Sequence, residues 1–83
     1  MEERALEKLL RDTLQKLGVK IRIEELEDGG GGFCRLDSEP LVVLSPTSSR
    51  KQHIQVFLRA LKQIDTAGIF LPPAVRDLLE EDE

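Results

Sequence analysis

Residues 41–64 read LVVLSPTSSRKQHIQVFLRALKQI, which is an apolar run, a polar turn and then a helical pattern. The run Leu41–Leu44 is continuous and rich in β-branched residues, which is typical of a strand covered on both faces. The hydroxyl residues that follow are good helix caps, because they accept hydrogen bonds from the free backbone N–H groups of a first turn. Ser49 and Gln52 have the spacing of a capping box, and the two preceding hydroxyl residues are alternative caps.

The helix predicted after this cap has apolar positions at intervals of three and four residues. These positions are Ile54, Phe57, Leu58, Leu61 and Ile64. We expect Thr66–Gly68 to end the helix and the apolar connector Ile69–Leu71 to dock on the core. Pro72 and Pro73 then favour the start of a short third helix, because proline is tolerated in a first turn.

Leucines at helical spacing near the N-terminus predict a first helix. Gly18 is expected to end it, because glycine adopts the left-handed conformation without a Cβ clash. Acids and bases four residues apart support its polar face, where Glu7 faces Arg11 and Asp12 faces Lys16.

Two strands are expected between this helix and residue 41. Val19–Glu24 alternates apolar and polar residues, which predicts a half-buried strand. Gly29–Gly32 is interpreted as a flexible connection, Phe33–Asp37 as a second strand and Asp37–Pro40 as a turn. The chain is therefore predicted to have an α+β fold: a helix, a three-stranded and mostly antiparallel sheet, a helix and a short C-terminal helix.

The position of the last strand in this sheet has two interpretations. Its apolar character favours the centre of the sheet. Short connections favour a simple meander instead, in which the last strand lies at an edge. Leu41, Val42, Val43 and Leu44 would then form an edge-strand interface for self-association or for capture of a partner strand.

Length and composition limit the class of protein. With 83 residues, residues 1–83 are expected to form one small domain, whose acidic tail 80–83 frays in solvent. No apolar run approaches the roughly 20 residues that span a bilayer, and the acidic start leads directly into a helix pattern without a secretory signal. The only cysteine, Cys34, excludes an internal disulfide and fits a reducing cytoplasm.

The sequence contains no strong catalytic or metal-binding motif. The glycines 29–32 follow Glu27 and Asp28 and precede a strand, whereas a phosphate loop opens a helix. Cys34 is interpreted as a small buried hydrophobe and His53 as a surface or boundary residue. We therefore expect no catalytic residue, no metal and no cofactor. A residual hydrolase built on Cys34 and His53 is the least favoured alternative, because it requires the two side chains within hydrogen-bond reach.

The second helix carries the one concentration of positive charge. Arg50, Lys51, Arg59 and Lys62 stand in a segment without an acid, and they form a candidate face for an acidic partner or for phosphates. A net charge of −4 and the lack of Trp and Tyr argue against general nucleic-acid binding. The alternative interpretation is a solvated face that attracts the acidic C-terminal tail.

The stretch 41–65 resembles the strand-to-helix core of the ImmA/IrrE family of bacterial zinc-protease-like regulators. Leu41–Leu44 match the strand, Ser45 its polar end, and Lys51 with Gln52 the helix start. The zinc-binding His-Glu-x-x-His of that family falls on residues 58–62, which read LRALK. The resemblance therefore implies a degenerate, metal-free member.

The whole chain also resembles a group of small, uncharacterised bacterial proteins that end in a segment of the type LPPAVR, here residues 71–76. That resemblance implies no activity. Taken together, these features lead us to expect a small cytoplasmic bacterial binding or regulatory module that contacts another protein or forms a homodimer. Weak nucleic-acid binding through the second helix is the alternative.

The composition predicts that the purified protein carries no stoichiometric zinc, because one Cys and one His fall short of the three or four ligands of a zinc site. Elemental analysis after dialysis measures this. About one zinc per chain would contradict it, unless the metal were shared between chains.

Overall fold

The computed structural model describes residues 2–25, 32–64, 68 and 70–81. The elements follow in the order α1 (Glu3–Lys16), β1 (Lys20–Ile23), β2 (Gly32–Leu36), β3 (Glu39–Leu44), α2 (Arg50–Gln63) and α3 (Pro73–Glu81). The predicted α+β fold is confirmed. Residues 1, 26–31, 65–67, 69 and 82–83 lie outside the described residues. They include three of the four loop glycines, Thr66 and Ala67 of the predicted helix end, and the last two residues of the acidic tail.

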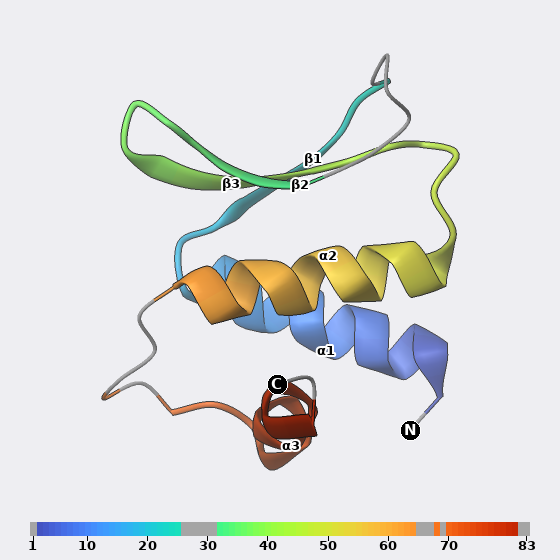
Figure 1. Cartoon of the computed structure of the whole chain (residues 1–83), viewed down its shortest axis with the longest axis vertical. Coiled ribbons are helices and arrows are strands. Elements are labelled where there is room, and N and C mark those ends of the chain that lie inside the picture. The colour runs from blue at the N-terminus through green and yellow to red at the C-terminus, as the bar shows by residue number, and fades with distance from the viewer. Residues whose placement is uncertain (1, 26–31, 65–67, 69, 82–83) are drawn as a thin grey trace.

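The elements form three layers (Figure 1). The sheet is the first layer, α1 and α2 lie side by side against one of its faces, and α3 packs on the other side of the helix pair. The core lies between these layers, and its largest fully buried side chains are Leu10, Leu14, Val42, Leu44, Phe57, Leu61 and Val75. Within the described residues, no helix covers the opposite face of the sheet.

The sheet has the strand order β1-β3-β2, so β3 lies at its centre. β3 pairs in parallel with β1 and antiparallel with β2. The meander order and the edge position of Leu41, Val42, Val43 and Leu44 are therefore wrong, and the alternative interpretation as the central strand is confirmed. The physical reason is burial, since Leu41, Val42 and Leu44 are buried and Val43 is half-buried. A strand this apolar is stabilised most when it has a neighbouring strand on each side.

The connection between β1 and β2 permits this order. Eight residues separate Ile23 from Gly32. They have to cross only two strand spacings, roughly 10 Å, and a chain of this length reaches much further. β1 and β2 run antiparallel to each other with β3 between them, so the end of β1 and the start of β2 lie at the same end of the sheet.

The hairpin β2–β3 closes through a two-residue turn. Asp37 and Ser38 have positive φ values of 52° and 69°, as the central residues of a type I′ turn require. Pro40, the second residue of β3, lies before the part of the strand that pairs with β1. Its missing N–H group therefore removes no bond to β1.

α1 ends at the predicted glycine in a Schellman motif. Gly18 has φ +87°, its N–H donates to the carbonyl of Gln15, and the N–H of Val19 donates to the carbonyl of Leu14. Val19 and Leu14 are both buried, which adds the usual hydrophobic contact of this motif. The motif turns the chain directly into β1.

The connector before α3 differs in part from its prediction. Leu71 is buried, with 7% of its surface exposed, and α3 begins at Pro73 as expected. Phe70, however, is 83% exposed, so its predicted docking on the core is wrong. Because Leu71 turns inward in an extended connector, its neighbour turns outward.

The start of α2 has the predicted capping box. The Oγ of Ser49 accepts from the N–H of Gln52 at 3.2 Å, and the Oε1 of Gln52 accepts from the N–H of Ser49 at 2.8 Å. Two backbone donors that the helix leaves without a partner are thus satisfied.

We predict that Ser49→Ala lowers the free energy of unfolding by about 1 kcal/mol, because it removes the acceptor at the N-cap. Urea unfolding followed by circular dichroism measures the change. Ser48→Ala is the matched control one residue earlier and should have little effect. Equal losses in the two variants would contradict the assignment of the cap.

Candidate functional site

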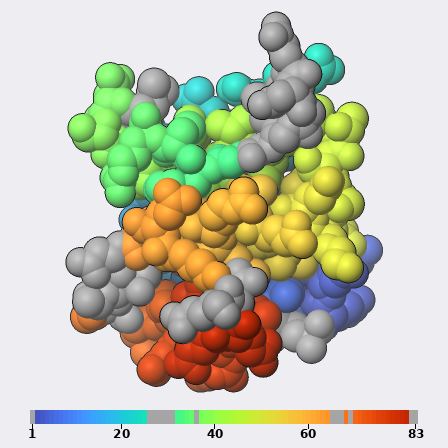
Figure 2. Space-filling model, viewed as in Figure 1, coloured from blue at the N-terminus to red at the C-terminus, as the bar shows by residue number. Residues whose placement is uncertain are grey.

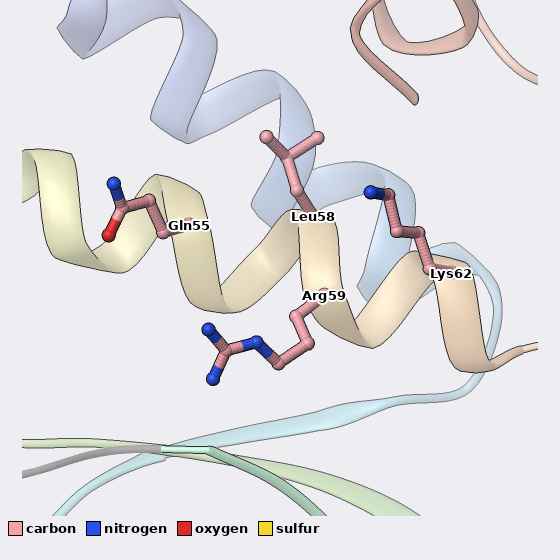
Figure 3. A pocket seen from close by; sticks show the side chains of 4 residues that line it. All are labelled: Gln55, Leu58, Arg59 and Lys62. Atoms are coloured by element: carbon pink, nitrogen blue, oxygen red, sulfur yellow. The ribbon is translucent and has the colours of Figure 1, made fainter. Parts of the chain in front are cut away.

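The outward face of α2 carries a hollow of about 470 Å³, lined by Gln55, Leu58, Arg59 and Lys62 (Figure 3). We call it the α2 hollow. Its residues recur at intervals of three, one and three along the helix, which places them on one face. Figure 2 shows this face of α2 between the sheet and α3.

The α2 hollow combines hydrogen-bond donors with an apolar floor. Leu58 is buried, while Gln55, Arg59 and Lys62 are exposed. In Figure 3 the side chain of Arg59 extends toward the sheet, and that of Lys62 extends to the other side of the helix. The side chain of Leu58 extends to the same side as Lys62, so a ligand seated on Leu58 would meet Lys62 first.

Only half of the predicted basic residues belong to this site. Arg59 and Lys62 line the α2 hollow, whereas Arg50 and Lys51 do not. Arg50 precedes Arg59 by nine residues, which at 3.6 residues per turn places it about 180° around the helix. The basic residues are thus not all on one face, since Arg50 lies opposite Arg59. Lys51, eleven residues before Lys62, nevertheless shares the face of Lys62, one turn before Gln55.

Arg50 instead joins α2 to α1. Its Nε lies 3.0 Å from the Oε2 of Glu7, whose other oxygen accepts from the Nη2 of Arg11 at 3.0 Å. The carboxylate of Glu7 is 15% exposed and holds both guanidinium groups. The pair of Glu7 with Arg11 is confirmed, and the pair with Arg50, 43 residues away, is an addition that no local spacing predicts.

His53 lies beside this carboxylate as a boundary residue, with 16% of its side chain exposed, as predicted. Its Nδ1 is 3.8 Å from the Oε1 of Glu7, which is longer than a hydrogen bond. Both ring nitrogens are buried and have no hydrogen-bond partner among the described residues. The imidazole therefore fills space between α1 and α2 at a cost in lost hydration.

Cys34 and His53 are not brought together. Phe33 packs against the core, so the next residue of β2, Cys34, points to the opposite face of the sheet. The thiol is exposed there, and the prediction that Cys34 is buried is wrong, because no described helix covers that face. His53 lies on the helix side, so the two residues do not meet the geometric requirement of a nucleophile and its base.

Sequence reasoning missed two residues of the α2 hollow. The predicted place of Leu58 in the core stripe is confirmed, but neither its part in the floor of the hollow nor a role for the amide of Gln55 is predicted. The spacing of Gln55, Leu58, Arg59 and Lys62 is the pattern that could have identified this face. The hollow itself depends on how α2 packs between the sheet and α3, and the spacing of residues along α2 does not determine this packing.

Comparisons of the chain with protein-family models, with curated proteins and with solved structures find no match. The resemblance to ImmA/IrrE proteins thus stays a prediction. Among the described residues there is no group of three or more His, Cys, Asp or Glu side chains that could hold a metal ion. None of the helices in the described ranges has the length and apolar character needed to cross a membrane.

We predict that His53→Leu raises the free energy of unfolding by about 1 kcal/mol, because an apolar side chain of similar size removes two buried nitrogens without partners. His53→Gln keeps a polar group in place and should not raise the free energy of unfolding. Urea unfolding of the three proteins measures the difference. A loss of stability in His53→Leu would show that the contact with Glu7 outweighs the cost of burial.

Proposed function

We propose that this protein is a binding module that acts through protein–protein contacts, and that the α2 hollow takes an acidic segment of its partner. The observation that carries the proposal is the hollow itself, which is lined by the buried Leu58 and by the exposed Gln55, Arg59 and Lys62.

The chemistry of these side chains favours carboxylates. A guanidinium group matches a carboxylate with two parallel N–H donors, and an ammonium group adds a second positive charge. The amide of Gln55 donates to a further oxygen. The methylene groups of a glutamate would lie on Leu58, so that a peptide side chain satisfies both the polar rim and the apolar floor.

A protein partner fits the site better than a nucleic acid. Affinity for a nucleic acid grows with the number of phosphates that are neutralised, and only Arg59 and Lys62 line the α2 hollow. Phe57, the aromatic residue of α2, is fully buried and offers no surface for base stacking.

We further propose that the module works in the cytoplasm. Cys34 is exposed and unpaired, and such a thiol persists in a reducing compartment. The proposed role needs no catalytic group.

The test is the affinity for a short polyglutamate peptide, measured by nuclear magnetic resonance titration. We expect the largest shifts at Gln55, Arg59 and Lys62. Arg59→Glu should weaken binding about tenfold or more, because one attraction is replaced by a repulsion of similar size. The affinity should also fall with added salt.

The matched control is Arg4→Glu, which makes the same change of charge at an exposed position of α1. This variant should bind like the wild type. Equal weakening by the two variants would mean that only net charge matters and would contradict the proposal. Tighter binding of a single-stranded oligonucleotide than of the peptide, again lost in Arg59→Glu, would favour the nucleic-acid alternative instead.

A further inference from the structure

Phe70 is the most exposed of the large apolar side chains in the described part of the chain. It is 83% exposed, compared with 60% for Ile23. The buried neighbour Leu71 anchors the connector and thereby holds the ring of Phe70 outward. Burial of an exposed phenylalanine in an interface is favourable, because its apolar surface is removed from water.

A groove of about 290 Å³ lies between α1 and this connector. It is lined by Leu9, Asp12, Thr13, Lys16, Leu17, Phe70 and Pro72. We call it the α1 groove. An apolar cavity of about 150 Å³ accommodates a benzene molecule, so the α1 groove has room for one phenyl ring. It shares no residue with the α2 hollow.

The α1 groove also carries one charge of each sign. Asp12 and Lys16 are one helical turn apart and both are exposed. The predicted ion pair between them is not formed, and neither residue forms an ion pair with any described residue. Both charges are therefore available to a surface of complementary pattern.

We infer that the α1 groove is the interface of a two-fold symmetric homodimer. Each copy inserts its Phe70 into the α1 groove of the other, and Asp12 of each copy faces Lys16 of the other. A two-fold interface brings the same patch of two copies together, so the patch has to be complementary to itself. This patch is complementary to itself, because the ring of Phe70 lies beside a groove that fits a ring, and Asp12 lies one turn from Lys16.

The same features favour a second copy over a different protein. A foreign partner would have to supply both an apolar side chain for the α1 groove and an apolar surface for Phe70. A second copy fills both grooves and covers both rings in one step. Antiparallel packing of the two α1 helices also places opposite charges together, whereas parallel packing would oppose like charges.

The test is the mass of the protein in sedimentation equilibrium over micromolar to millimolar concentrations. We expect a monomer–dimer equilibrium for the wild type. Phe70→Ser should raise the dissociation constant by about a hundredfold or more, because both rings leave the interface. Ile23→Ser, which removes the other exposed large apolar side chain, should leave the dissociation constant unchanged. Unchanged circular dichroism confirms that each variant is folded.

A charge exchange tests the orientation of the two copies. Asp12→Lys alone places like charges together and should weaken the dimer, and the double variant Asp12→Lys with Lys16→Asp should restore it. A wild type that stays monomeric at millimolar concentration would overturn the inference. So would a dimer that survives Phe70→Ser, or a mass that grows beyond the dimer, since a head-to-tail contact does not close.

Discussion

The need to pair both edges of β3 and to cover one of its faces determines the rest of the structure. Its residues Leu41–Leu44 are apolar at every position, so exposure of either face or either edge would leave apolar surface or backbone groups in water. β1 and β2 cover the two edges, and α1 and α2 cover the face that carries Val42 and Leu44. The charged residues of β1 then lie at the edge of the sheet, where Lys20 pairs with Glu39 across the strands at 3.2 Å.

The helices are fixed to this strand through Phe57 and to each other through Glu7. Phe57 is fully buried in the same cluster as Leu10, Leu14 and Val42. Glu7 adds a directional contact, since its bond to Arg50 joins α1 to α2, while its bond to Arg11 lies within α1. One side of each helix is thereby used for the core. The proposed binding surfaces, on α2 and on α1, use the sides that remain.

The sequence predicts the elements of this fold better than their arrangement. Periodicity identifies the stripe of α2, and local rules identify the cap at Ser49 and the stop at Gly18, because these features depend on neighbours within five residues. The strand order depends on which pairing buries Leu41–Leu44 best, and this involves residues about 20 positions apart. The exposure of Cys34 depends on which face of the sheet the helices cover, and this is also a matter of tertiary packing.

The same distinction holds for the candidate site. Arg59 and Lys62 were identified by their charge, but Arg50 was assigned to the same face although its partner is Glu7 on α1. Charge can be read from composition, whereas the partner of a charge depends on tertiary contacts. The α1 groove could not be predicted from the sequence for a similar reason. Phe70 and Leu9 line the same groove only because α1 and the connector pack together.

The exposed thiol of Cys34 has a practical consequence. It is the only cysteine of the chain, and it lies on the sheet face opposite the helices. A maleimide dye or spin label therefore attaches to the wild-type protein at this single position. The attached group is remote from the surfaces of α1 and α2, so spectroscopic distances between labels can be measured while those surfaces stay unmodified.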